Sequence, residues 1–316
     1  MKTIIFILLH FYLLFSSNAY SQCCSAGNPV SGEGTIEEMD KKDFKISAFY
    51  KHSSSSDYYH LEKKQDIPFI DKSYYDFINT SLTYGLFPKF ALHAEMGYFI
   101  DKSQELNLTN ENTMIRSRGF GDLGIQARYT LYKTVKPITS LVASLGTKIP
   151  VGNFSEEING ITIPVSLQPS SGALKFNAAL FYSRMRSDRK WGWQTFSLFE
   201  ISNLINTGFL IYKYGNYFQY SLAGNYKLIE NLLLIGNLKF EWRGLDTRES
   251  GIKVESSGSR VVYFNPQIIY TLKSTWNIIF LADIPVYKYI NGYQLTNKFS
   301  FQLGVSKMIF TCKTEI

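Results

Sequence analysis

Charged residues of this sequence recur at every second position within apolar segments, and that spacing limits the chemistry they could perform. Lys239, Glu241 and Arg243 alternate with large apolar side chains, and His93 and Glu95 have the same spacing. Successive side chains of a β-strand point to opposite faces, so each charged group shares one face of a strand. Charges gathered on one face can form ion pairs with neighbouring strands or attract charged solutes.

The same alternation assigns one set of polar positions to the inside of a closed sheet. Basic residues outnumber acidic ones in this set, so a pore with such a lining would favour anions. Pairing of opposite charges would instead pack a narrow interior, and the sequence leaves both interpretations open. The candidate lumen-lining residues are Lys45, His93, Glu95, Asp122, Arg128, Lys148, Lys175, Glu200, Lys227, Lys239, Glu241, Arg243 and Asp283.

Patterns typical of catalysis do not stand out. No Ser/His/Asp constellation is apparent, and Gly119–Gly121 lacks the Gly-Lys-Ser/Thr of a phosphate loop, so these glycines indicate a strand start or bulge. His52 and His60 bracket a serine-rich segment and are the weak alternative for a metal site. The net charge of +7 is spread over loops and candidate lining positions. We therefore expect no enzyme, no cofactor, no metal and no nucleic-acid partner.

Period-two alternation continues along the chain in long segments. Most span 9 to 14 residues, whereas strands of soluble proteins average about five or six and tilted membrane strands need about nine to eleven. Beyond the N-terminus no apolar run is long enough for a spanning helix. The sequence predicts about twelve strands, over residues 43–51, 73–86, 90–100, 120–132, 138–150, 171–183, 191–202, 214–227, 232–244, 259–272, 275–287 and 294–309.

Short and long links alternate between these segments. Phe87–Lys89 and Lys273–Ser274 are examples of the short links, and His52–Lys72 and Asp101–Gly119 of the long polar ones. Bacterial outer-membrane barrels have short periplasmic turns and longer outer loops. Aromatic residues cluster near the predicted short turns, as they do where a barrel wall meets lipid headgroups. The predicted fold class is all-β: a closed antiparallel transmembrane β-barrel in the outer membrane.

Three prolines lie within or beside the predicted strands. Proline cannot donate a ladder hydrogen bond, so it is expected at strand ends, edges or bulges. We expect Pro150 and Pro285 to mark strand ends or bulges, and we expect a local bulge at Pro266.

The N-terminus has the features of a secretory signal. Residues 1–21 combine Lys2 with an apolar stretch too short to span a bilayer and small residues near its end. Cleavage is expected before Gln22, and a retained membrane anchor or lipid attachment at Cys23 is the alternative.

The remaining chain divides into three parts. Residues 22–42 are predicted to be an irregular periplasmic or plug segment, 43–310 the transmembrane barrel and 311–316 a C-terminal tail. Cys312 could bridge to Cys23 or Cys24, or all three could be free thiols.

Several glycine- and proline-containing motifs stand out, namely Gly119–Gly124 with Ala127–Tyr129, Gly146–Gly152, Ile284–Tyr287, Asn291–Leu295 and Leu303–Ser306. These motifs resemble those of a known group of outer-membrane proteins, the meta-pathway phenol-degradation family. That group is thought to help aromatic or other hydrophobic compounds cross the membrane, and it supplies no catalytic set. The beginning of the mature chain is similar to secreted proteins of the Bacteroidetes type.

Together, the residues and the resemblance lead to one functional expectation. We expect an outer-membrane channel or transporter for passive passage of small compounds, including hydrophobic or aromatic ones. The alternative is a structural or adhesive surface barrel with a closed lumen. The expected partners are outer-membrane lipid, the barrel-assembly machinery and a small-molecule solute, with the chain acting as a monomer.

Overall fold

The computed structural model describes most of the predicted barrel. The predicted signal peptide, Cys23, Cys24, Cys312 and the C-terminal tail lie outside the described residues, as does most of the segment 22–42. Among the described residues, no helix is long and apolar enough to cross a membrane. The described ranges are 39–67, 70–108, 111–158, 160–208, 210–249, 251–273 and 275–310.

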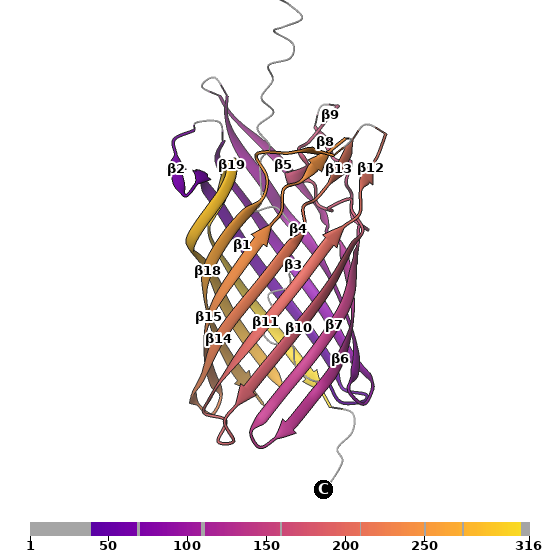
Figure 1. Cartoon of the computed structure of the whole chain (residues 1–316), viewed down its shortest axis with the longest axis vertical. Coiled ribbons are helices and arrows are strands. Elements are labelled where there is room, and N and C mark those ends of the chain that lie inside the picture. The colour runs from indigo at the N-terminus through magenta and orange to yellow at the C-terminus, as the bar shows by residue number, and fades with distance from the viewer. Residues whose placement is uncertain are drawn as a thin grey trace, which may run out of the picture.

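A single antiparallel sheet forms the wall of the molecule (Figure 1). Its last element pairs with its first, which closes the sheet into a barrel. In the described part of the chain the wall consists of β1 (Phe44–Leu61), β3 (Ile70–Phe87), β4 (Phe90–Leu108), β6 (Leu123–Val135), β7 (Ile138–Ile149), β10 (Lys175–Met185), β11 (Trp191–Ser202), β14 (Tyr217–Ile229), β15 (Leu232–Arg243), β18 (Ser259–Leu272) and β19 (Trp276–Ile309).

The long element β19 crosses the wall twice. Its first part, up to Ile290, pairs with β18, and its second part pairs with β1. The hydroxyl of Ser300 in the second part donates to Asp283 in the first at 3.0 Å. Gly292 has a φ of 57° and permits the tight reversal between the two parts. The described wall therefore has twelve passes, which confirms the predicted fold class.

Side chains alternate across the wall with the polarity of a membrane protein. Leu238 is 53% exposed, whereas its neighbour Asn237 is 8% exposed. The same contrast recurs around the barrel: buried wall positions are mainly polar and exposed ones mainly large and apolar. Aromatic side chains near the short turns, including Tyr84, Tyr129 and Tyr226, are exposed. An apolar outer band with aromatic edges is the surface that lipid requires.

The strands extend further than predicted at the end of the barrel with the long links. β1 continues to Leu61 and β3 starts at Ile70, so most of the predicted loop His52–Lys72 is strand. Likewise, β4 and β5 (Glu111–Phe120) pair along most of the predicted loop Asp101–Gly119. These segments are polar on both faces, so backbone pairing continues there without a period-two hydrophobic signal.

Smaller elements fill the long links at this end of the barrel (Figure 1). Strands from two different links form one sheet in the order β12-β13-β16-β17, so these links are joined by backbone hydrogen bonds. The small elements are β2 (Lys63–Gln65), β8 (Glu157–Ile158), β9 (Ile161–Thr162), the 3₁₀ helix η1 (Val165–Leu167), β12 (Ile205–Asn206), β13 (Ile211–Lys213), β16 (Thr247–Arg248) and β17 (Ile252–Lys253).

Two of the three proline predictions are confirmed. Pro150 directly follows the end of β7, and the register of β18 against β19 shifts beside Pro285. The predicted bulge at Pro266 is wrong, because Pro266 pairs with Gly236 in an unbroken register. The side-chain amide of Asn265 donates to the carbonyl of Ala282 at 2.9 Å on the β19 side. This side-chain donor replaces a ladder bond where proline has no N–H.

The outward face of β14 allows a test of membrane orientation. Leu222 lies in the middle of the strand and Leu228 beside a short turn, and both are exposed. We expect Leu222→Arg to reduce folding stability by about 2–4 kcal/mol and Leu228→Arg by about 0–1 kcal/mol, because arginine is costly at the bilayer midplane. Urea unfolding in lipid vesicles measures both, and equal losses would contradict this placement of the membrane.

Candidate functional site

The predicted lining residues all lie on or directly beside strands of the wall, and most are buried. Lys227 is the residue nearest to a short turn, and it is partly exposed. Three residues of β15, Lys239, Glu241 and Arg243, are also only partly buried. The fully buried members are Lys45, His93, Glu95, Asp122, Arg128, Lys148, Lys175, Glu200 and Asp283.

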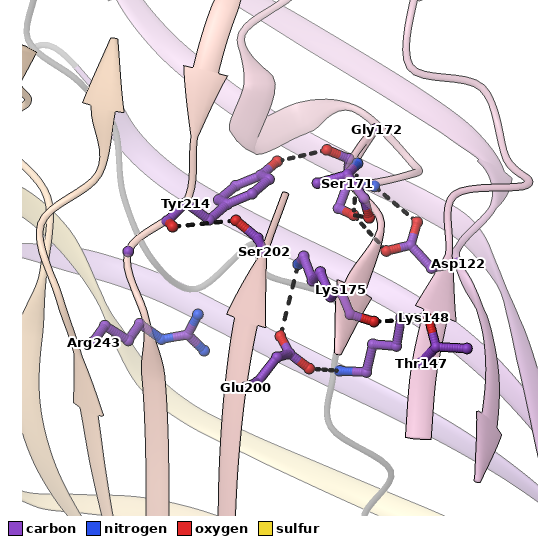
Figure 2. A network of polar contacts seen from close by, with 12 residues as sticks. Asp122, Thr147, Lys148, Ser171, Gly172, Lys175, Glu200, Ser202, Tyr214 and Arg243 are labelled. Atoms are coloured by element: carbon purple, nitrogen blue, oxygen red, sulfur yellow. Dashed lines mark hydrogen bonds and ion pairs between the residues drawn. The ribbon is translucent and has the colours of Figure 1, made fainter. Parts of the chain in front are cut away.

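The first group of charges joins three consecutive strands (Figure 2). The Lys148 Nζ atom on β7 lies 2.9 Å from Glu200 Oε2 on β11. The Lys175 Nζ atom, on β10 between them, lies 3.9 Å from Glu200 Oε1. Arg243 extends toward the same carboxylate in Figure 2. One carboxylate thus serves two lysines, and we call Lys148, Lys175 and Glu200 the lysine pair site.

A second group joins β15 to both passes of β19 and to β1. The Lys239 Nζ atom lies 2.8 Å from Asp283 Oδ1 and 3.0 Å from Glu241 Oε1. Asp283 also accepts hydrogen bonds from Asn265 and Ser300, each at 3.0 Å. The Lys51 Nζ atom lies 3.8 Å from Asp283 Oδ2. Buried charges are tolerated when they are paired and hydrogen-bonded, which is the case here.

Other predicted residues make the following contacts outside these two groups. His93 Nδ1 lies 2.9 Å from the Thr83 hydroxyl, and His93 Nε2 lies 3.9 Å from Glu95 Oε2. Arg128 donates to Gln126 Oε1 at 3.4 Å. The alternation in the sequence gives the face of each residue, and it does not give these cross-strand groupings.

Five residues of this region were not predicted from the sequence. Lys51 and Lys102 add basic charge, and three tyrosine rings lie beside cations. Lys175 Nζ is 4.5 Å from the Tyr214 ring centre, Lys239 Nζ is 4.5 Å from that of Tyr263, and the Arg243 guanidinium is 4.7 Å from that of Tyr217. Strand register explains the last pair, because Arg243 lies opposite Tyr217. Lys102 falls in a predicted loop, which is why alternation did not find it.

The link between β7 and β10 is fixed to the wall by charged groups. One oxygen of Asp122 accepts from the Ser170 hydroxyl at 2.7 Å and the Ser171 backbone N–H at 2.9 Å. Its other oxygen accepts from the Ser171 hydroxyl at 2.5 Å. The Lys102 ammonium donates to the Gln168 carbonyl at 2.7 Å. We call these contacts the mouth latch, because they hold this link at the end of the barrel with the long links.

The links also share a small core of their own. Ala173, Ile205, Tyr212 and Val254 come from three different links and pack together. The Tyr212 hydroxyl donates to Asp246. Burial, together with the Asp246 carboxylate, raises the pKa of Tyr212 well above its usual value, so this hydroxyl stays protonated as a donor. The three links therefore form one packed layer.

Strands β1, β3 and β4 carry buried aromatic rings, and the Lys102 Nζ atom lies 4.6 Å from the centre of the Phe99 ring. Phe77 and Phe99 have ring centres 4.6 Å apart. A Cβ atom at Gly97 would lie 1.9 Å from the Phe77 ring, and one at Gly304 would lie 2.0 Å from the Phe49 ring. Each glycine therefore makes room for a phenylalanine ring against the wall. We call Phe49, Phe77 and Phe99 the aromatic strip.

Metal chemistry has no obvious ligand set in the part of the chain that the structure describes. There, no three His, Cys, Asp or Glu side chains are grouped so that they could hold an ion. The arrangement consists of paired charges and aromatic rings.

The mouth latch can be tested by proteolysis. Glu156 and Glu157 lie on the held link, so a glutamate-specific protease reports its release. We expect Asp122→Ala to speed cleavage there by about 10-fold or more, since hydrogen bonds to a charged group contribute about 1.5–3 kcal/mol. Asp188→Ala, in a short turn at the other end, is the control. Unchanged cleavage in Asp122→Ala would show that the latch does not hold the link.

The second charge group can be tested by stability. Asp283→Ala leaves Lys239 and Lys51 without this carboxylate, and loss of one partner from a buried pair costs about 3–5 kcal/mol. We therefore expect Asp283→Ala to unfold in detergent at a lower midpoint concentration of urea than the wild type. The double variant Lys239→Met/Asp283→Leu removes both charges and should recover much of the loss. A double variant as unstable as Asp283→Ala would contradict the charge explanation.

A solved outer-membrane channel shares this fold, and two further barrels are similar at a lower level. The COG4313 outer membrane channel from Pseudomonas putida F1 aligns over 90% of this chain and 100% of its own, with 14% identity and a TM-score of 0.71. The KdgM porin in complex with disordered oligogalacturonate aligns over 84% and 99%, with 8% identity and a TM-score of 0.46. A Pseudomonas aeruginosa FadL homologue aligns over 84% and 90%, with 9% identity and a TM-score of 0.43.

Sequence comparison agrees with the resemblance stated above. No curated protein matches the chain significantly. The family described as "Putative MetA-pathway of phenol degradation" matches residues 99–299, which is more than half of the 316 residues. The family and the fold place the barrel in an outer membrane. The chain belongs to the family described as "Putative MetA-pathway of phenol degradation".

Proposed function

We propose that this chain is an outer-membrane channel for passive passage of small compounds, including hydrophobic or aromatic ones. The observation that carries the proposal is a closed barrel whose buried positions are polar and charged along its height, from Lys45 to Lys102. A barrel with no solute path could fill its interior with apolar side chains, which avoids the cost of desolvating charged groups. A polar and charged lining therefore favours a path for solutes. The candidate lining residues would then line that path.

The aromatic strip supports the hydrophobic part of the proposal. Its rings lie on strands β1, β3 and β4, whereas the lysine pair site lies on β7, β10 and β11. A path with a ring-covered side and a charged side offers contacts to solutes that carry an apolar body. The family's description in terms of phenol degradation agrees with solutes of this kind.

The proposal also covers catalysis, oligomeric state and partners. The chain acts by binding and passage rather than by catalysis, which agrees with the description of the Pseudomonas putida protein of the same fold as an outer membrane channel. Because the sheet closes within one chain, a monomer is sufficient. Assembly would use the barrel-assembly machinery, and nucleic acid has no role.

A second candidate is a structural or adhesive surface barrel. The ion pairs of the lysine pair site and the packed layer of outer links favour it, since both would also strengthen a closed barrel. The two candidates differ in whether solutes pass.

Planar-bilayer recordings and liposome swelling decide between these functions. We expect the folded, purified protein to give discrete conductance steps in potassium chloride. We also expect it to speed swelling in a small neutral sugar that lipid excludes. Heat-modifiable gel mobility verifies that the barrel is folded. Folded protein with neither conductance nor solute flux would contradict the channel and favour the structural barrel.

A further inference from the structure

The lysine pair site contains a like-charge contact that one carboxylate only partly compensates. Lys175 lies directly opposite Lys148 in the register of β10 against β7. Like charges at directly opposed positions destabilise a sheet unless an anion lies with them. Glu200 supplies one carboxylate, which is 2.9 Å from Lys148 and 3.9 Å from Lys175. The Lys175 contact is longer than a hydrogen bond.

The two other acids nearby have partners of their own. Asp122 accepts from Ser170 and Ser171 in the mouth latch. Glu95 lies 3.9 Å from His93. Arg243, which extends toward Glu200 in Figure 2, lies 4.0 Å from a carboxylate oxygen of Glu241. Among the described residues, Lys175 therefore has no carboxylate oxygen within hydrogen-bond distance, and the carboxylate of a solute would pair with it as Glu200 pairs with Lys148.

The position of the lysine pair site relative to the aromatic strip indicates a second feature of the solute, an apolar ring. Between β4, which carries Phe99, and β10, which carries Lys175, the wall contains β6 and β7. The rings and the lysines thus occupy different sides of the barrel interior. A solute that has an apolar ring and a carboxylate can contact both sides at once, whereas acetate or a neutral aromatic molecule contacts one.

We propose that the barrel selects small amphiphilic organic anions, with the carboxylate bound at Lys175 and Lys148 and the apolar ring against the aromatic strip. This inference rests on the proposed channel function and specifies its solute class. Arginine and lysine on one side of a narrow path raise the local concentration of anions, and the rings add contacts that a small inorganic ion cannot make.

Reversal potentials across planar bilayers test the proposal with benzoate and acetate as probes. Under tenfold gradients of sodium benzoate or sodium acetate, we expect the wild type to pass anions in preference to sodium. We also expect benzoate to be at least as permeant as acetate despite its larger size. Preference for sodium, or benzoate permeability well below that of acetate, would overturn the proposal. Absence of any conductance would instead contradict the channel function itself.

Two variants separate the charge from the ring. Lys175→Gln should lower the benzoate-to-sodium and acetate-to-sodium permeability ratios several-fold. Phe77→Ala should lower the benzoate ratio and leave the acetate ratio close to the wild type. Lys213→Gln is the matched control, because Lys213 is exposed and adjoins Tyr214 in sequence. Heat-modifiable mobility confirms folding of each variant.

The variants also define how the proposal fails. Equal effects of Lys175→Gln and Lys213→Gln would show that only surface charge matters. Equal effects of Phe77→Ala on benzoate and acetate would show that the aromatic strip does not recognise rings. The wild-type comparison of the two anions needs no substitution, so it stands even if a variant fails to fold.

Discussion

Hydrogen bonding of the backbone in lipid is the constraint on which this structure depends. Hydrocarbon cannot satisfy the N–H and C=O groups of an open strand edge, so a sheet that crosses a membrane has to close. Here the closure is the long pairing of β1 with the second pass of β19, which runs from Phe44 opposite Ile309 to Tyr59 opposite Gln294. Once the sheet is closed, every strand has one face toward lipid and one toward the interior. The sorting of apolar and polar residues follows from this geometry.

Charges placed on the inner face have to be compensated across strands. Lys239 and Asp283 do this between β15 and β19, and Lys148 and Glu200 do it between β7 and β11. The same principle fixes the long link after β7, which Asp122 holds through two serines. Paired charges, the packed layer of links and the aromatic strip all contribute to the interior, and Lys51 and Lys102 bring charge to the strands that carry the rings. The proposed selectivity arises from charges and rings together and from no single residue.

Sequence reasoning succeeded where a local pattern has a direct geometric meaning. The period-two alternation of Leu238 against Lys239 gave the fold, the number of passes and the buried face, because side-chain direction alternates strictly along a strand. It failed where both faces are polar, so the outer extension of β4 and the buried Lys102 were missed. It also could not pair Lys148 with Glu200, since contacts between residues on different strands depend on register. Pro266 shows a third limit: a neighbouring asparagine side chain supplies the donor, and no bulge is needed.

The two glycines beneath phenylalanine rings have a consequence for the bore of the barrel. At Gly97 and Gly304 the space next to the backbone is already occupied by Phe77 and Phe49. A methyl group at either position would lift the ring off the wall and toward the barrel axis. The inner diameter on this side is therefore controlled from positions that have no side chain. Glycine and phenylalanine at these paired positions act as a unit, so a change in one requires a smaller ring or a different rotamer at the other.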